Sequence, residues 1–435
     1  MKKIWQKNSK QIKDNELTKF VEYFTVGKDY IYDLELAPYD IEASKAHAEG
    51  LEKINILTKN ECKKIISALD EIADMHKNNK FEILPEHEDC HTVIEILLTE
   101  KLGDLGKKIH TGRSRNDQVL VAIRMWERKK IEELAQNLKT LIQNFLDFAK
   151  KYEFVPMPGY THTQRAMLSS IGMWAGSFAE NLIFNLESLL EVKKNVNKCP
   201  LGSSAGFGVN FDLQREFVSK KLGFDEPITI SLTAQNTRIS TDIEVLHSLS
   251  TISATLSHFA NDLIWFTTAE FNFFEVESAL TTGSSIMPQK KNLDTAEILR
   301  GQHAYVLGLE FSLKNLGKNL ISGYNRDFSL TKESIMNGFG KIFDMVQMAN
   351  FLILNIKPKE KNLRQKCTAE IFATDAVNEL VKKGTPFRDA YKKIGNNLEK
   401  LKKVDLDKNL KSKTHLGATG NLGLEVLEKK LKKIM

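Results

Sequence analysis

Proline is scarce in this chain of 435 residues, and its distribution leaves long uninterrupted stretches. Only nine prolines occur, at positions 38, 85, 156, 158, 200, 227, 288, 358 and 386. Because proline breaks helix interiors, the three longest gaps, 86–155, 228–287 and 289–357, leave room for long helices. Signals for β-hairpins are scarce as well, so the sequence favours a mostly helical protein.

Cysteine is also rare, and its four positions are scattered: Cys62, Cys90, Cys199 and Cys367. No CxxC pair occurs, which argues against a disulfide framework and against a cysteine-based zinc site. Free thiols in a reducing cytosol are therefore expected. The first residues do not form the apolar run of a signal peptide, and no stretch of 18 apolar residues exists. We predict a cytoplasmic protein without a membrane span.

Charge of either sign is not in large excess. The formal net charge of +6 is small for this length and is spread along the chain, so it favours small anionic ligands. No pattern of alternating aromatic and basic residues supports a nucleic-acid partner. The lysine-rich end at 429–433 is typical of a solvated helix face.

Apolar residues inside the proline gaps recur every three or four positions, which is the spacing of a helix face. Two such stripes are Ile131, Leu134, Leu138, Leu141, Phe145 and Phe148, and Leu246, Leu249, Ile252, Leu256, Phe259, Leu263 and Phe266. We predict an all-α protein with three helical domains, 1–110, 111–357 and 358–435, the central one being a bundle of long helices. In a closed homotetramer, the apolar core of this bundle would continue into neighbouring subunits. A monomer is the alternative.

The segment at 282–292, TGSSIMPQKKN, has the composition of a loop but is rich in reactive groups. Hydroxyl, ammonium and amide side chains all lie within it. A loop of small residues can move and close over a substrate, and its lysine and asparagine can donate to charge that develops on a substrate oxygen. The alternative is a solvated loop between two helices.

Two further clusters combine glycine with polar side chains. The first, HTGRSRNDQ at 110–118, precedes an expected helix; its arginines suit a carboxylate, although an N-cap with surface ion pairs explains it equally well. The second, PGYTHTQRA at 158–166, places His162 at an expected loop-to-helix junction. Histidine is the usual general acid or base near neutral pH, but a lone histidine is more often structural.

A possible metal site lies upstream, where HEDCH at 87–91 formally matches the HExxH pattern. On one helix, His87 and His91 would share a face, with Glu88 as a possible base. The match is short and no third ligand is evident. A glycine-rich turn at 200–208 lacks the lysine of a phosphate loop and is interpreted as a connection.

Together these segments resemble the fumarase/aspartase superfamily of fumarate-releasing lyases, whose signature loop reads GSSxMPxKxNP. Within it, HTGRSRNDQV, PGYTHTQ and the doubled lysine of MPQKKN are similar to the argininosuccinate lyase family. Further similar positions are Asp40-Ile41 with Ser44 and His47, the EDCHT stretch at 88–92 and YNRD at 324–327. The resemblance extends over roughly residues 20 to 400. It implies a fumarase/aspartase-like fold and a role for His91 other than metal binding.

The resemblance also implies an activity, the cleavage of argininosuccinate to arginine and fumarate in arginine biosynthesis, without a metal or cofactor. Ser284 matches the family's catalytic base and His162 the general acid. Lys290 and Asn292 would stabilise the dianion formed when the proton is removed. Glu297 could pair with His162 and raise its pKa. The substrate would be held by Ser114, Arg115, Asn116, Thr161, Tyr324 and Lys332, with His91 in support, in sites shared between subunits.

Some positions depart from the family pattern. Leu293 stands where the signature loop has proline, and residues 5–7 are all that remains of an early WGGRF motif. Gly27 replaces a substrate-contacting serine, and Ser329 replaces a glutamine. Other lyases of the superfamily and an inactive helical scaffold are the alternatives. The RSRND stretch and the doubled lysine speak against the former, and the retained catalytic set speaks against the latter.

Overall fold

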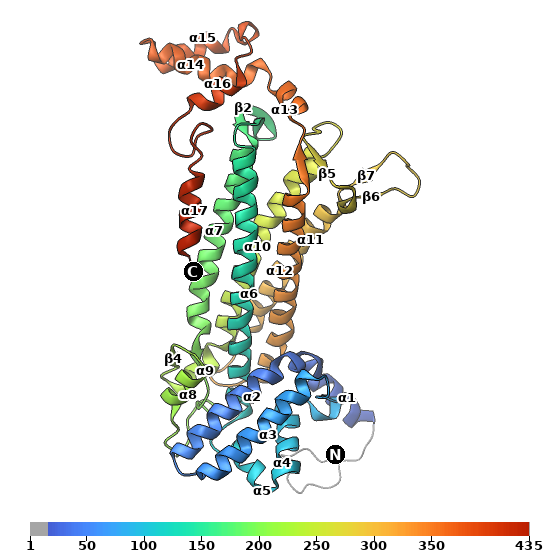
Figure 1. The fold of residues 1–435 in the computed structure, drawn as a ribbon, viewed down its shortest axis with the longest axis vertical. Coiled ribbons are helices and arrows are strands. Elements are labelled where there is room, and N and C mark those ends of the chain that lie inside the picture. Colours follow the sequence, from blue (N-terminus) through green and yellow to red (C-terminus); the bar gives the residue numbers. More distant parts are fainter. Residues whose placement is uncertain (1–15, 435) are drawn as a thin grey trace. The chain divides into compact units, whose positions relative to one another are not determined.

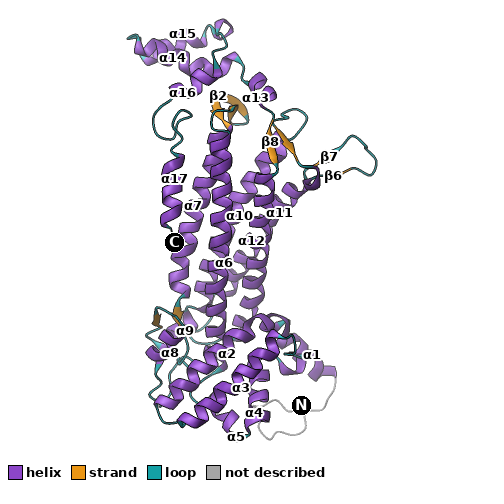
Figure 2. Ribbon diagram, viewed as in Figure 1, coloured by secondary structure: helices purple, strands orange, loops and turns teal. Residues whose placement is uncertain are grey.

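The structure is a computed structural model that describes residues 16–434, and it is dominated by helices, as Figures 1 and 2 show. The predicted fold class is confirmed, while residues 5–7 lie outside the described residues. The chain divides into two compact units. Unit 1 comprises Met1–Glu133, Leu189–Leu249 and Leu307–Gly340, and unit 2 comprises Leu134–Ser188, Ser250–Val306 and Lys341–Met435. The three sequential domains stay a prediction. None of the helices in the described chain is long and apolar enough to cross a membrane.

Long helices fill the proline gaps, as predicted. They are α6 (Arg115–Lys151), α10 (Arg238–Phe266), α11 (Asp294–Leu316) and α12 (Thr331–Leu354). A fifth long helix, α7 (Ile171–Val196), lies between Pro158 and Pro200, outside the three predicted gaps. Each of the five contributes residues to both units. Both predicted apolar stripes are buried, from Ile131 to Phe145 on α6 and from Leu246 to Leu263 on α10. Burial of these stripes, rather than helix propensity alone, stabilises helices of this length.

Unit 1 contains the shorter N-terminal helices. They are α1 (Glu16–Val26), α2 (Asp29–Lys53), α3 (Lys59–Lys77), α4 (Cys90–Leu102) and α5 (Asp104–Lys107). Later in the chain, unit 1 also contains the short helices α8 (Arg215–Lys221) and α9 (Ser231–Asn236). It also contains one parallel strand pair, β3 (Lys198–Cys199) with β4 (Glu226–Pro227). Helix α3 begins with a capping box: the Glu61 backbone N–H donates to Thr58 Oγ1 over 3.2 Å, and the Thr58 N–H donates to Glu61 Oε2 over 2.8 Å. Buried Ala43, Val121 and Phe224 belong to one apolar cluster that joins α2, α6 and the segment after α8.

Unit 2 has an aromatic core. Phe145 of α6 contacts Phe178 of α7 and Phe259 of α10, with ring centroids 5.9 Å and 5.0 Å away, so these three helices pack side by side there. Three antiparallel strand pairs follow: β1 (Pro156–Thr161) with β2 (Gln164–Ser170), β5 (Phe274–Val276) with β8 (Ile356–Pro358), and β6 (Thr282–Gly283) with β7 (Lys291–Asn292). The remaining helices are α13 (Glu360–Lys366), α14 (Ala373–Lys382), α15 (Phe387–Gly395), α16 (Leu406–Ser412) and the predicted lysine-rich helix α17 (Leu424–Lys433).

Candidate active site

The reactive loop of unit 2 is closed by a short strand pair rather than by two flanking helices. Thr282 pairs with Asn292 and Gly283 with Lys291 in antiparallel register, which leaves 284–290 as the loop that extends away from the helices in Figure 1. The base of the loop is tied to α11, because Thr282 Oγ1 donates to Asp294 Oδ2 over 2.9 Å. The tip is exposed, with Ile286 at 83%. An anchored base with an exposed tip suits a loop that moves as a lid.

Ser284 lies at the start of this loop, and its hydroxyl accepts two backbone hydrogen bonds. The N–H groups of Ile286 and Met287 donate to Ser284 Oγ over 3.3 Å and 3.1 Å. Donors aimed at an oxygen stabilise negative charge on it. The local backbone therefore favours the ionised hydroxyl that a serine base would need.

The other polar residues predicted for this loop leave their side chains available. Lys290 is exposed and Asn292 is half-buried on β7. Glu297, in the first turn of α11, is exposed as well. Within residues 16–434, none of these three side chains makes a hydrogen bond or ion pair. Their donors and acceptors are thus free for a ligand or for another subunit.

His162 does not lie at a loop-to-helix junction, and that expectation was wrong. It occupies the two-residue turn between β1 and β2, where Thr161 pairs with Gln164 and α7 begins only at Ile171. His162 and Thr163 have φ values of 51° and 61°, as a type I′ turn requires. Such φ values are costly for residues other than glycine and are concentrated at functional sites. The turn presents His162 to solvent, next to exposed Thr161.

Unit 1 contains a polar pocket with a cavity volume of about 60 Å³, enough for a few water molecules or one small charged group. Three residues predicted to hold substrate, Arg115, Tyr324 and Lys332, line it. Its other lining residues are Val26, Asp29, Glu88, Asp89, Val119, Arg238, Arg326 and Ser329. The predicted residues are therefore brought together by α6, α12 and the segment before α12.

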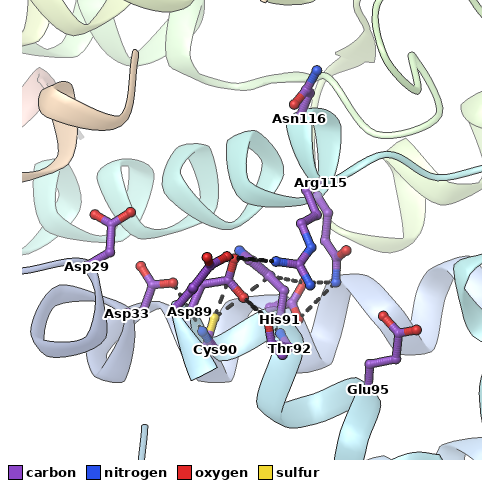
Figure 3. A network of polar contacts seen from close by, with 12 residues as sticks. Asp29, Asp33, Asp89, Cys90, His91, Thr92, Glu95, Arg115 and Asn116 are labelled. Atoms are coloured by element: carbon purple, nitrogen blue, oxygen red, sulfur yellow. Dashed lines mark hydrogen bonds and ion pairs between the residues drawn. The ribbon is translucent and has the colours of Figure 1, made fainter. Parts of the chain in front are cut away.

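Arg115 is the first residue of α6 and is oriented by an acid on another element. Its Nη1 donates to Asp89 Oδ2 over 3.0 Å, as Figure 3 shows. Asp89 is fixed in turn, because it caps α4 by accepting the N–H of Thr92 at 2.8 Å. Burial would raise the pKa of Asp89, but His91 and Arg115 hold it below its ordinary value. The guanidinium is thus held at the pocket by an ionised partner.

Lys332 is buried among acids of α2. Its Nζ lies 2.5 Å from Asp33 Oδ1 and 3.2 Å from Asp29 Oδ2. Burial alone would lower the pKa of Lys332, but the two carboxylates raise it above its usual range. The lysine remains an ammonium at the edge of the pocket.

The start of α6 serves a structural role alongside its role at the pocket. Asp117 accepts the N–H of Ser114 at 3.0 Å, and its other oxygen accepts the N–H groups of Gly202 and Ser204 at 2.9 Å and 2.8 Å. Burial raises the pKa of Asp117 to about 6, against the effect of these donors. Half-buried Ser114 Oγ accepts the N–H of Asn116. The helix-cap explanation therefore describes part of this cluster, and the ligand site stays a prediction.

A model of the lyase family matches residues 17–308. A curated argininosuccinate lyase of Thermotoga neapolitana is 40% identical over 395 residues, which cover 90% of this chain and 97% of that protein. One of Bacteroides fragilis is 39% identical over 420 residues, or 97% of this chain and 92% of that protein.

The chain belongs to the argininosuccinate lyase family. Solved structures are similar in fold at low identity. An EDDS lyase in complex with formate has a TM-score of 0.80 at 21% sequence identity. The match covers 95% of this chain and 90% of the EDDS lyase chain. A class II fumarase from Schistosoma mansoni has a TM-score of 0.72 at 14% sequence identity. That match covers 89% of this chain and 94% of the fumarase chain.

His91, expected in this family to support the substrate, is fully enclosed. Its Nδ1 lies 3.1 Å from Asp40 Oδ1, and both side chains are almost completely buried. Burial would lower the pKa of His91, but Asp40 and Asp89 raise it above its ordinary value, which favours the charged ring. Asp40 also accepts from Gln118 Nε2 at 3.0 Å. His91 therefore acts behind the pocket, where it fixes α4 against α2 and α6.

The HExxH interpretation fails on geometry. His87 ends a 3-10 turn (Pro85–His87), Glu88 has a φ of 67°, and α4 begins only at Cys90, so His87 and His91 do not share a helix. His87 Nδ1 accepts the backbone N–H of Leu84 at 3.1 Å. A different cluster, Asp33, Cys90 and His91, has ligand atoms within 4.8 Å of one another. Lys332 Nζ already pairs with Asp33, and His91 Nδ1 already pairs with Asp40, so these side chains are committed to other partners and do not fit a metal ion.

Sequence reasoning missed two residues that line the pocket, Asp29 and Arg238. Neither belongs to a motif. Asp29 opens α2, and Arg238 opens α10 about two hundred residues later. Only the packing of α2 and α10 around the Tyr324 segment brings them to one place, so no local pattern could have found them.

Proposed function

We propose that this protein catalyses the reversible β-elimination of 2-(N-L-arginino)succinate to L-arginine and fumarate. Membership of the argininosuccinate lyase family supports the reaction. The observation that carries the proposal is the loop at 284–290, in which two N–H groups converge on Ser284 Oγ beside the free donors of Lys290 and Asn292. A proton acceptor and two donors for a carboxylate are thus built into one short segment, 284–292.

The difficult step is removal of a weakly acidic proton from the carbon next to a carboxylate. Ser284, ionised, takes that proton, and the electron pair delocalises into the carboxylate, which becomes a dianion. Lys290 and Asn292 donate to this dianion, and they act best where closure of the loop excludes water. The pair then forms the C=C bond of fumarate as the C–N bond breaks.

The departing guanidino nitrogen requires a proton, and His162 supplies it. The type I′ turn presents the imidazole to solvent without a partner in the described chain, so it is available to a substrate held elsewhere. Glu297 would orient His162 and favour its protonated form. No hydrogen bond joins Glu297 to His162 within residues 16–434, so this pairing would form between subunits or on loop closure.

Substrate holding falls to the pocket of unit 1 and its surroundings. Arg115, Lys332 and Tyr324 line the pocket. Ser114 and Asn116 lie beside Arg115 at the start of α6. In unit 2, Thr161 adjoins His162 and would contact the substrate from there. His91 supports this set from behind by fixing Asp40.

The assembly we propose is a homotetramer in the cytosol whose sites combine residues of different subunits. Helix α11 exposes Ile298 at 65% in unit 2 and Phe311 at 68% in unit 1, and α10 exposes Trp265 at 56%. Large exposed apolar side chains along a long helix are typical of an interface between subunits. The four cysteines are free and buried, as in proteins of reducing compartments.

The test is the ultraviolet absorbance of fumarate released from argininosuccinate by the purified protein. A panel of argininosuccinate, adenylosuccinate, aspartate and malate discriminates among lyases of the superfamily. We expect turnover of argininosuccinate alone, unchanged after prolonged treatment with a chelator. Preferential turnover of another member of the panel, or activity that is lost to the chelator and restored by a divalent ion, would contradict the proposal.

A further inference from the structure

The middle of α2 carries three buried polar side chains that take no part in the chemistry of the proposed reaction. Asp40 and Ser44 are completely enclosed, and His47 is 3% exposed. Positions 40, 44 and 47 recur every three or four residues, so they share one face of the helix. Polar groups are costly to bury without partners, so each of these side chains should be matched by a group on a neighbouring element.

The partners of Asp40 and Ser44 lie in one short segment, 111–118. Gln118 Nε2 donates to Asp40 Oδ1 over 3.0 Å, and Arg113 Nη1 donates to Ser44 Oγ over 2.8 Å. The Nε atom of Arg113 is buried and unpaired within the described chain, so the guanidinium depends on its bond to Ser44. Two side chains of the segment are thus fixed to one helix face.

His47 holds the backbone of the same segment. Its Nε2 lies 2.9 Å from the carbonyl oxygen of Thr111. Burial, together with the nearby Arg113 guanidinium, holds the pKa of His47 well below its ordinary value, so the ring is neutral. Because a carbonyl oxygen only accepts, the single ring proton stands on Nε2 and is donated to Thr111.

The three contacts occur in opposite order along the two elements. As α2 runs from 40 to 47, its partners run from 118 back to 111. Seven helical residues span about 10 Å, so the segment lies antiparallel along roughly two turns of α2. Residues 114–116, the proposed substrate-holding positions, stand between the contacts made at 113 and 118. They are therefore anchored on both sides by α2.

We propose that this face of α2, formed by Asp40, Ser44 and His47, is a template that positions residues 114–116 for the substrate. The inference rests on the proposed function, which assigns those residues to substrate holding. None of the three template side chains is among the residues that line the pocket of unit 1, so they act through the segment rather than by contact with substrate. Displacing groups that hold the substrate equally in the ground and transition states raises KM and leaves kcat unchanged.

Substitutions at His47 separate its hydrogen bond from its packing. His47→Gln keeps an N–H donor near the place of Nε2, whereas His47→Leu fills a similar volume without one. We expect His47→Leu to raise KM for argininosuccinate about threefold to tenfold, as loss of one hydrogen bond provides, with little change in kcat. His47→Gln should restore KM to near the wild-type value. Equal KM values for the two variants, or a loss confined to kcat, would overturn the proposal.

A second measurement follows the segment without the reaction. Hydrogen exchange of the assembled protein, followed by mass spectrometry, should be faster at 112–118 in His47→Leu than in the wild type and in His47→Gln. Ile72→Val is the control, since it removes one methyl group from a buried residue of α3 in the same unit. It should lower the thermal transition without changing KM or exchange at 112–118.

Ser44→Ala provides an independent variant. It removes the acceptor of Arg113 and should raise KM and speed exchange at 112–118 in the same way. If His47→Leu fails to fold, as its thermal transition would show, Ser44→Ala decides by the same two measurements. The two ideas fail separately. Unchanged exchange at 112–118 in these variants refutes this inference whether or not fumarate is released. Faster exchange in a protein that releases no fumarate from argininosuccinate refutes the proposed reaction only.

Discussion

Lys332 and Asp33 form an ion pair that is removed from solvent, with Nζ 2.5 Å from Oδ1 and side-chain exposures of 3% and 0%. They belong to α12 and α2, which are separated by about three hundred residues in sequence. The pair connects α12, which contributes Lys332 to the pocket lining, to the N-terminal helix α2. A buried pair contributes little net stability, but loss of one partner leaves an uncompensated charge.

Asp33→Asn should therefore destabilise the protein by about 3–5 kcal/mol. The pKa of Lys332 is raised in the folded state above its unfolded value of 10.5. The stabilisation that depends on the lysine's charge is therefore fully present below pH 10.5 and is lost only as pH rises through the folded-state pKa. The destabilisation should thus be similar at pH 6 and pH 8 in denaturant unfolding. The matched control is Glu333→Gln, on the same helix as Lys332. It breaks the exposed ion pair of Glu333 with Lys28 and should cost at most about 1 kcal/mol. Equal costs for the two variants would contradict the prediction.

Ser284→Ala should leave the fold and the assembly intact and remove nearly all turnover. The two N–H groups that point at Ser284 Oγ would remain, but the proton acceptor would be gone. Fumarate release should fall by far more than tenfold, which is about 1.4 kcal/mol of barrier. Ser285→Ala, at the next position, which is exposed, is the control and should retain activity. Turnover within tenfold of wild type would remove Ser284 from the role of base.

His162→Asn should slow departure of the arginine while substrate still binds. Asparagine tolerates positive φ better than most residues, so the turn at φ 51° should survive. The expected result is a lower kcat with little change in KM, measured by steady-state kinetics. Thr163→Asn tests the neighbouring position of the same turn and should retain kcat. A normal kcat with a raised KM would identify His162 as a binding residue instead.

Mixing the two inactive variants tests whether sites combine residues from different subunits. After mild dissociation and reassociation of equal amounts of Ser284→Ala and His162→Asn, about one quarter of sites would carry neither lesion if these residues come from different subunits. Fumarate release should then return to a corresponding fraction of wild-type activity. A mixture that stays inactive despite demonstrated subunit exchange would place both residues in one subunit.

Glu127 provides a pH-dependent contribution to stability. Burial raises its pKa to about 7, although Arg124 Nη1, 2.5 Å from Glu127 Oε2 and 2.7 Å from Asp242 Oδ1, opposes the shift. The folded state therefore retains a proton that the unfolded state releases near 4.5. As pH rises from about 5 to 7, this residue should reduce the free energy of unfolding by up to about 1.4 kcal/mol per pH unit.

The comparison of Glu127→Gln with wild type isolates this effect. As pH rises across that window, the thermal stability of the wild type should fall relative to that of the variant. Glu132→Gln, which removes a partly exposed acid that pairs with Lys193, should show no such trend. A difference that is constant between pH 5 and pH 8 would show that Glu127 is ionised throughout.

The sequence by itself determined the helical architecture and the content of the reactive loop. The wide proline gaps and the buried stripe from Ile131 to Phe145 specify a long helix, because helix periodicity is a local property of the chain. Thr58 and Glu61 likewise specify the start of α3 within four residues. Contiguous motifs such as 282–292 could be recognised for the same reason.

Only the tertiary structure decided the surroundings of those residues. The turn at His162 was missed because its positive φ values are imposed by strand pairing on residues that do not favour them. The ion pair of Lys332 with Asp33 and the placement of Arg238 against Tyr324 join residues far apart in sequence. Burial and long-range electrostatics set the charge of these groups, and neither is encoded in any local pattern.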